Sequence, residues 1–119
     1  MFADRLRGHL KGHTGQATFI INCNKGGMVP MMFGSVEAIS KQAMDKYMAS
    51  GNACHNNYQF GEDRWMGECM KSLLVYGVED FGLVGDKVCT GADCSDGKAA
   101  YHFFKNEAAW IGCYNTAVR

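Results

Sequence analysis

Gly61-Glu62-Asp63-Arg64-Trp65-Met66-Gly67-Glu68-Cys69-Met70 carries a helical pattern and predicts a helix that begins near Glu62 and ends at Gly77. Apolar residues in and after this stretch recur three and four positions apart and would form one buried stripe: Trp65, Met66, Cys69, Met70, Leu73 and Leu74. A glycine inside a helix costs about 1 kcal/mol relative to alanine. Gly67 therefore predicts a close approach of another element to this helix.

Two adjacent carboxylates, Glu62 and Asp63, fall in the first turn of this helix. Acidic side chains there stabilise a helix by about 0.3–1 kcal/mol, which is the structural interpretation of the pair. The functional interpretation is that the carboxylates bind hydroxyl groups or take a proton as a general base. His102 lies downstream between aromatic residues, where it either satisfies one hydrogen bond or serves as a metal ligand.

Outward from this helix, glycine, proline and capping residues divide the chain into short elements. We expect a helix over 3–12, a strand over 17–23, an extended run over 28–33, a helix from its N-cap Ser35 to Gly51 with Glu37 in its first turn, strands over 80–84 and 99–104 joined by a loop, and a final helix capped by Asn106. This alternation indicates an α/β fold with three to four helices around short mixed β-strands. A length of 119 residues suits one domain over 1–119.

The composition narrows the class of protein. Hydrophobic residues make up 47% of the chain and charged residues 20%, which is typical of a globular domain. The formal net charge is zero, so charge gives no reason to expect nucleic acid or a membrane surface as a partner. The longest apolar runs are too short to cross a bilayer, and the first residues lack the apolar core of a signal peptide.

Six cysteines are many for this length, and an even number favours disulfides and an oxidising compartment. Six cysteines allow about fifteen pairings, which sequence alone leaves open. The alternatives are buried free thiols, a loop closed between Cys89 and Cys94, and a zinc site made by Cys54, His55, Cys89 and Cys94. The disulfide interpretation supports a small, non-catalytic secreted or interaction module.

Two motifs together resemble a known family. Glu62-Asp63-Arg64-Trp65-Met66-Gly67-Glu68-Cys69 and Tyr101-His102-Phe103-Phe104 resemble the Glu-Asp-Val-x-x-Gly-x-Cys and Phe-His-Pro-Phe segments of inverting β1,3-glycosyltransferases of the fringe and core 1 galactosyltransferase kind. Arg64 stands where the family has valine, and Phe103 where it has proline. The resemblance covers residues 17–117 and implies the C-terminal, acceptor-side half of a GT-A-type hexosyltransferase domain.

The resemblance also implies roles for individual residues. Asp63 matches the base that takes the proton of the acceptor hydroxyl, and Glu62 would bind the acceptor or orient Asp63. His102 matches a ligand of the divalent cation, usually Mn²⁺, that neutralises the diphosphate leaving group. Trp65 would stack on a sugar ring, although its place on the apolar stripe also suits a core residue.

The family's Asp-x-Asp metal motif does not occur in this chain. By the resemblance, the chain begins after that motif and is an incomplete domain, inactive alone, that would bind Mn²⁺ only with the upstream half. The implied partners are a nucleotide sugar and a glycan or protein acceptor. The implied compartment is the Golgi or endoplasmic reticulum lumen, with the membrane reached only through an N-terminal anchor outside this chain.

Overall fold

The computed structural model describes residues 1–25, 29–55, 60–89 and 91–119. Within these residues, four helices and four short strands follow one another: α1 (Ala3–Leu10), β1 (Thr18–Ile21), α2 (Lys41–Ala49), α3 (Glu62–Ser72), β2 (Tyr76–Glu79), β3 (Val84–Asp86), β4 (Ala100–His102) and α4 (Glu107–Ala117). The expected α/β class is confirmed at this level.

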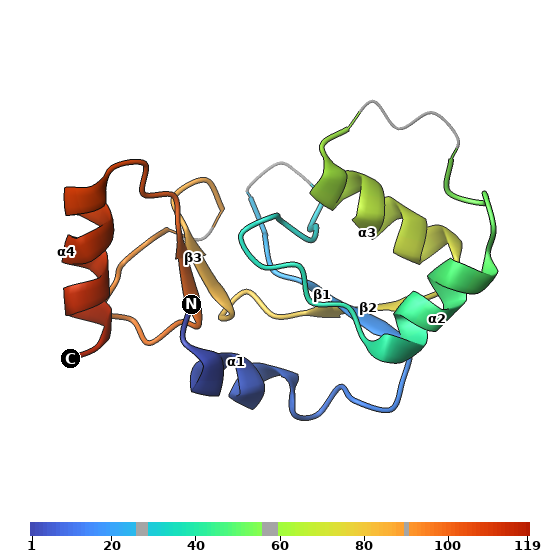
Figure 1. Ribbon diagram of the computed structural model, residues 1–119, viewed down its shortest axis with the longest axis horizontal. Coiled ribbons are helices and arrows are strands. Elements are labelled where there is room, and N and C mark those ends of the chain that lie inside the picture. The colour runs from blue at the N-terminus through green and yellow to red at the C-terminus, as the bar shows by residue number, and fades with distance from the viewer. Residues whose placement is uncertain (26–28, 56–59, 90) are drawn as a thin grey trace.

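The strands form two separate parallel pairs, β1 with β2 and β3 with β4. In the first pair Thr18 is opposite Tyr76, and in the second Asp86 is opposite His102. The other edge of β1 is covered by the segment before α2, because the Ile20 amide donates to the Ala38 carbonyl at 2.9 Å. Figure 1 shows α3 and α1 on opposite sides of the β1–β2 pair, with α4 at the far end of the molecule.

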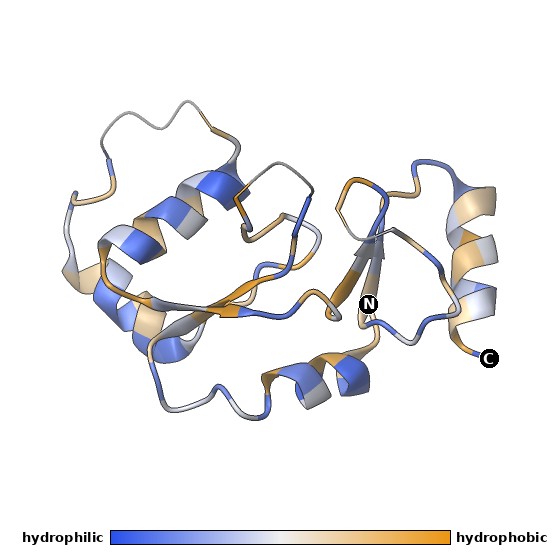
Figure 2. Cartoon of the chain, turned by 180° about the vertical axis from the view of Figure 1, so that it is seen from behind, coloured by the Kyte–Doolittle hydropathy of each residue, from blue (hydrophilic) through white to orange (hydrophobic). Residues whose placement is uncertain are grey.

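Side chains that alternate along β1 contribute to both hydrophobic cores. Phe19 and Ile21 belong to the cluster beneath α2 and α3, whereas Ile20 belongs to the cluster that Leu6 and Leu10 of α1 help to cover. Successive residues of a strand face opposite sides, so one short strand can serve two cores. Figure 2 shows the hydrophobic β1 strand between helices that carry both hydrophilic and hydrophobic residues.

The helix expected from Ser35 begins later, at Lys41, and this part of the prediction is wrong. Ser40 is the N-cap, and its Oγ accepts a hydrogen bond from the Ala43 amide at 3.2 Å. The residues before Ser40 stay extended because they pair with β1, where the Ser40 amide donates to the Thr18 carbonyl at 2.9 Å. Ser35 is thereby free to bind another part of the molecule.

The third helix begins at Glu62 as expected, but it ends at Ser72 rather than Gly77. Leu74 takes a left-handed conformation, with φ of 58°, and turns the chain into β2. Gly77 instead lies within β2. The strand expected over 80–84 was also misplaced, since β2 precedes it and β3 begins at Val84.

Gly67 is buried in α3, but its neighbour is no closer than an ordinary contact. A Cβ atom added at Gly67 would lie 3.8 Å from the Cβ of Met32. That separation is a normal van der Waals distance, so an alanine would fit. The close approach expected at this position lies at Gly77 instead, where an added Cβ would be 2.7 Å from Cδ1 of Ile21.

The last helix, α4, is capped as expected, with Asn106 Oδ1 accepting from the Ala109 amide at 2.9 Å. Cys113 and Ala117 are its buried residues. Trp110 and Tyr114 are roughly half exposed and stack on each other, with ring centroids 5.7 Å apart. This helix is therefore buried along only part of its surface.

All six cysteines are paired in three disulfides: Cys23–Cys89, Cys54–Cys69 and Cys94–Cys113. The expectation of disulfides is confirmed. The alternatives of free thiols, a loop closed between Cys89 and Cys94, and a zinc site that includes Cys54 are wrong, because each sulfur already has another partner. Cys23–Cys89 joins the end of β1 to the segment after β3 and so holds the two strand pairs together.

In the extended run over 28–33, Met31 exchanges backbone hydrogen bonds of 3.0 Å with Cys23, while Met28 lies outside the described residues. Within the part of the chain that the structure describes, no helix has the length and apolar character needed to cross a bilayer.

Candidate functional site

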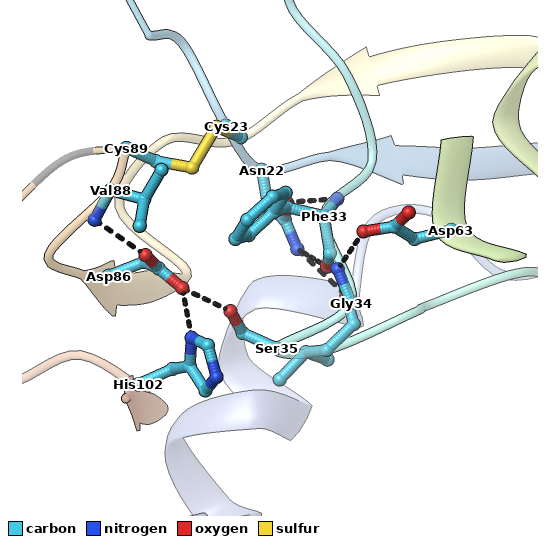
Figure 3. Close-up of a disulfide and its surroundings, with 11 residues drawn as sticks. Asn22, Cys23, Phe33, Gly34, Ser35, Asp63, Asp86, Val88, Cys89 and His102 are labelled. Carbon is cyan, nitrogen blue, oxygen red and sulfur yellow. Dashed lines mark hydrogen bonds and ion pairs between the residues drawn. A yellow bond between two sulfur atoms is a disulfide. The ribbon is translucent and has the colours of Figure 1, made fainter. Parts of the chain in front are cut away.

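His102 lies at the end of β4 beside Asp86, its partner residue on β3. The Nδ1 atom of His102 is 2.6 Å from Oδ2 of Asp86. A carboxylate in this position holds an imidazole in one orientation, and with Nδ1 protonated the lone pair lies on Nε2. Neighbouring ends of parallel strands thus create a positioned histidine, which Figure 3 shows next to Ser35.

Asp86 is the most buried carboxylate of this site, with 2% of its surface exposed. Burial acts to raise its pKa, but hydrogen bonds from the Ser35 hydroxyl, the Val88 amide and His102 together lower the pKa below the ordinary value of an aspartate. The Ser35 Oγ donates to Oδ2 at 2.7 Å and the Val88 amide to Oδ1 at 2.8 Å. Asp86 is therefore ionised at neutral pH and fully hydrogen-bonded.

Asn22, which is 2% exposed, fixes the loop that contains Ser35 through hydrogen bonds to its backbone. Asn22 Nδ2 donates to the Phe33 carbonyl at 3.1 Å and to the Val36 carbonyl at 2.7 Å, and Asn22 Oδ1 accepts from the Phe33 amide at 2.8 Å. Three hydrogen bonds from one buried amide fix the backbone on both sides of Gly34 and Ser35. We call this segment, residues 33–36, the central loop.

Asp63 binds the same loop from the other side. Its Oδ2 accepts from the Gly34 amide at 2.9 Å, and its Oδ1 accepts from the Arg64 amide at 2.7 Å. A Cβ atom at Gly34 would lie 3.3 Å from Asp63 Oδ2 and 3.6 Å from Glu62 Oε1. The absence of a side chain at Gly34 therefore lets both carboxylates of the α3 start approach the loop.

Glu37 adds a third carboxylate to this region. Partial burial raises the pKa of Glu37 above its ordinary value, and the negative charges of Glu62 and Asp63 raise it further. The negative charges of Glu62 and Asp63 thus act on Glu37, the residue that follows the central loop. Sequence analysis placed Glu37 in a helix, so its approach to Glu62 and Asp63 was not foreseen.

The structure thus brings two predicted site residues, Asp63 and His102, to adjacent residues of one loop. Asp63 binds Gly34, and His102 reaches Ser35 through Asp86. Figure 3 shows the two side chains approaching the loop from opposite sides. A cavity of about 650 Å³ is lined by Ser35 and Glu37 but by neither Asp63 nor His102.

Trp65, predicted as a sugar-stacking residue, lies two residues after Asp63 in α3. Its ring meets the ring of Tyr47 edge to face, with centroids 6.3 Å apart. Trp65 is partly buried and packs against the core beneath α2 and α3. Its observed contacts are those of a residue at the edge of the core.

A divalent cation would need several ligands besides His102. Among residues 1–25, 29–55, 60–89 and 91–119, no group of three or more His, Cys, Asp or Glu side chains is placed to hold a metal ion. Asp86 is already committed to Ser35, Val88 and His102. The described residues therefore do not fit a complete cation site, although His102 has the orientation of a single ligand.

Ser35, Asp86 and His102 also differ from a nucleophilic triad. In such a triad the histidine takes the proton of the serine hydroxyl. Here both Ser35 Oγ and His102 Nδ1 bind the same oxygen of Asp86. The serine therefore donates to the carboxylate, and the histidine is not placed as its base.

Sequence reasoning missed Asp86 and Asn22, the two buried polar residues that organise the site. The signal for Asp86 was its place after the apolar residues Leu83 and Val84, at the carboxyl end of a strand. Asn22 similarly follows the apolar run of β1. Each residue thus lies at the carboxyl end of a strand in its own parallel pair, and such strand ends are where sites of α/β proteins are commonly built.

Comparison of the chain with protein-family models, with curated proteins and with solved structures gives no match.

Proposed function

We propose that this chain forms the acceptor side of an inverting sugar transferase that moves a hexose from a nucleotide sugar to a hydroxyl of a glycan or protein. The supporting observation is that Asp63 and His102, far apart in sequence, are both linked to the central loop, Asp63 directly through Gly34 and His102 through Asp86 and Ser35. Such a reaction needs a base at the attacking hydroxyl and groups that stabilise the departing diphosphate. The resemblance to glycosyltransferases assigns these tasks to the same two residues.

Asp63 is the proposed base. Each of its oxygens accepts one backbone hydrogen bond, which fixes the carboxylate and leaves further lone pairs for an acceptor hydroxyl. As the hydroxyl oxygen bonds to the anomeric carbon, its proton passes to Asp63. The bond from that carbon to the diphosphate oxygen breaks, and its electron pair leaves with the diphosphate. Glu62 would bind another acceptor hydroxyl beside Asp63.

His102 is proposed as one ligand of the cation, Mn²⁺ by the resemblance, that accompanies the diphosphate. Nε2 is the ring nitrogen suited to this role, because Asp86 occupies Nδ1. Mn²⁺ favours oxygen ligands. The diphosphate itself supplies such oxygens, so the described residues need not hold the cation alone. Trp65 remains a proposed contact for a sugar ring at the edge of this region.

The three disulfides support an oxidising compartment for the folded chain. We therefore propose the lumen of the Golgi or endoplasmic reticulum, in keeping with a role in glycan synthesis. Disulfide mapping of the protein purified from its natural source, with thiols alkylated before lysis, should recover all three pairings. Recovery of six alkylated cysteines would argue for a reducing compartment.

Transfer can be tested on the upstream-extended gene product that the resemblance implies, since the chain alone is expected to be inactive, with a panel of nucleotide sugars and Mn²⁺. We expect release of a nucleoside diphosphate from one donor, and a product whose anomeric configuration is inverted relative to that donor by NMR. Retention of configuration would contradict a single displacement with Asp63 as base. Absence of release with every donor in the panel would contradict the transferase proposal.

A second candidate function is a small disulfide-stabilised module without catalysis. The observation that favours it is the pairing of all six cysteines in a chain of 119 residues. In that case Asp63 and Asp86 would act only in stability. Substituting both by asparagine would then change the unfolding midpoint but leave binding to the module's protein partner unchanged.

A further inference from the structure

The Cys23–Cys89 disulfide lies between the residues that organise the candidate site, as Figure 3 shows. Cys23 directly follows Asn22, which fixes the central loop through three hydrogen bonds. Cys89 directly follows Val88, whose amide donates to Oδ1 of Asp86 at 2.8 Å. The disulfide thus joins the residue that supports the central loop to the residue that supports the Asp86 carboxylate.

The backbone holds the two cysteines differently. The amide and the carbonyl of Cys23 both pair with Met31, at 3.0 Å. Among the described residues, the Cys89 backbone makes one hydrogen bond, from its amide to the Asp86 carbonyl at 3.1 Å. Without the disulfide, the segment that contains Val88 and Cys89 would be held chiefly by its hydrogen bonds to Asp86.

A cavity of about 190 Å³ lies beside this disulfide. Both Cys23 and Cys89 line the cavity, and Cys89 is partly exposed, whereas Cys23 is 4% exposed. The Cys54–Cys69 disulfide lies in the core instead, and its two residues are 1% and 0% exposed. A reductant in solution therefore has a route to Cys89 that it lacks to Cys54 and Cys69.

Lys25 brings a positive charge to the same cavity. Within the described part of the chain, no carboxylate forms an ion pair with Lys25. A neighbouring cation stabilises the thiolate that leaves when a disulfide is broken, and a better leaving group speeds the exchange. An accessible sulfur on Cys89 and a cation beside the bond are both features of a reactive disulfide.

We propose that Cys23–Cys89 is a site of thiol–disulfide exchange, at which a dithiol reductant releases Val88 and loosens the Asp86–His102 pair. A thiolate of the dithiol attacks Sγ of Cys89, the bond between Cys89 and Cys23 breaks, and its electron pair leaves with Sγ of Cys23, which takes a proton. The second thiol of the dithiol then attacks the dithiol sulfur of this mixed disulfide. Cys89 leaves and takes a proton, and the dithiol is oxidised to a disulfide.

Reduction would act on the site through the Asp86 carboxylate. Release of Val88 removes the hydrogen bond to Oδ1 of Asp86, whereas Ser35 and His102 still bind Oδ2. With one oxygen no longer fixed, the carboxylate can turn, and the orientation of the His102 ring becomes less defined. The oxidised chain therefore has an ordered site and the reduced chain a loosened one.

The rate of reduction tests the accessibility of the disulfide. The oxidised chain is mixed with dithiothreitol under native conditions, quenched with an alkylating agent at successive times and mapped by mass spectrometry. We expect Cys23 and Cys89 to be alkylated at least about tenfold faster than Cys54 and Cys69, because exchange rates depend on access to the sulfur. Alkylation of Cys23 and Cys89 no faster than that of the core pair would overturn the proposal.

The charge of Lys25 is tested by Lys25→Met, with Lys46→Met as the control. Lys46 is exposed on α2 and does not line the cavity. We expect Lys25→Met to slow the reduction of Cys23–Cys89 roughly threefold, the scale of one exposed charge interaction, and Lys46→Met to leave the rate unchanged. Equal rates in the two variants would overturn the role assigned to Lys25.

NMR during the reduction tests the connection to the site. We expect the amide signal of Val88 and the ring signals of His102 to shift as Cys23–Cys89 opens, while the amide of Ala43, which Ser40 caps at the start of α2, stays unchanged. Unchanged signals of Val88 and His102 would overturn the effect on the site. Signals that move throughout the chain would overturn it too, because the disulfide would then be purely structural.

These measurements need no sugar transfer. Failure of the exchange site would therefore leave the transferase proposal standing, and failure of transfer would leave the exchange site standing.

Discussion

Asp86 and His102 are opposite one another on parallel strands, and Oδ2 of Asp86 lies 2.6 Å from Nδ1 of His102. The register of β3 and β4 alone brings the two residues together. The Ser35 hydroxyl binds the same carboxylate oxygen and links the strand ends to the central loop. The site is therefore built on secondary structure, with a loop fixed to it by hydrogen bonds.

Asp86→Asn tests this arrangement through the pH dependence of stability. The pKa of Asp86 is lowered by folding, so the unfolded chain binds more protons around the unfolded pKa of about 3.9. The stabilisation is complete above that pH and is lost as pH falls through the folded pKa. We expect Asp86→Asn to cost about 1–3 kcal/mol at pH 7, by weakening buried hydrogen bonds, and less at pH 3.

Asp80→Asn is the matched control, because Asp80 pairs with His9 at the same 2.6 Å outside the site. Urea unfolding at the two pH values measures both variants. This control should lower stability at pH 7 by less than Asp86→Asn does, since Asp80 is more exposed than Asp86. An equal loss for Asp86→Asn at both pH values would contradict the ionised state of Asp86.

Glu37→Gln should have the opposite sign. Folding raises the pKa of Glu37, so the folded chain binds the proton of Glu37 more tightly than the unfolded chain does. This preference stabilises the folded state at low pH and is lost as pH rises through the folded pKa. At pH 7 the glutamine variant is relieved of repulsion from Glu62 and Asp63. Because Glu37 is exposed and screened, we expect a gain of only about 0.3 kcal/mol at low salt, smaller in high salt. Lower stability of the glutamine variant at pH 7 would contradict the repulsion of Glu37 by Glu62 and Asp63.

Gly77→Ala should destabilise the β1–β2 pair. The added Cβ would lie 2.7 Å from Cδ1 of Ile21 and 3.1 Å from Cζ of Phe19, both in the buried core. Such overpacking costs about 1–3 kcal/mol. Gly8→Ala in α1 is the control, because nothing lies within 4 Å and alanine favours a helix by roughly 1 kcal/mol. If Gly77→Ala and Gly8→Ala moved the denaturant midpoint in the same direction, the result would contradict the pairing of β1 with β2.

The disulfides should differ in their contribution to stability according to the chain they enclose. Cys23–Cys89 spans a sequence separation of 66, and Cys94–Cys113 one of 19. Loop-closure entropy gives about 4 kcal/mol for the first and about 3 for the second. Replacing each pair by alanine and measuring urea unfolding should reproduce this order. The reverse order would show that local packing outweighs chain entropy.

Local sequence signals predicted the helices better than the strands. The Asn106 cap and most of the apolar stripe of α3 depend on near neighbours in the chain, and both were found. Leu74, predicted as part of that stripe, instead lies beyond the end of α3 and is 86% exposed. Ser35 and Ser40 are equally good N-caps by residue type, and only pairing of the preceding segment with β1 selects Ser40. Gly77 was predicted to end a helix because glycine is common at helix ends. Its close packing against Ile21 depends on tertiary contacts, which the local sequence does not show.

The same distinction applies to the site. Asp63 and His102 carried signals in their own sequence neighbourhoods. Asp86 carried only the signal of its place after Leu83 and Val84, because its role depends on the register between β3 and β4 and on the position of Ser35. Glu37 was noticed only as a residue of a helix that begins elsewhere. The sequence does not reveal which residues support a site through tertiary contacts until the positions of distant segments are known.

The most direct measurement is the rate of sugar transfer by the upstream-extended gene product with Asp63→Asn, beside the exposed control Asp45→Asn. Asparagine keeps the shape of the side chain and can still accept from Gly34, but it cannot take a proton at neutral pH. We expect transfer to fall at least about a hundredfold, the scale of general-base catalysis, with donor binding and the unfolding midpoint nearly unchanged. Transfer at the unsubstituted rate in Asp63→Asn would contradict the assignment of Asp63 as the base.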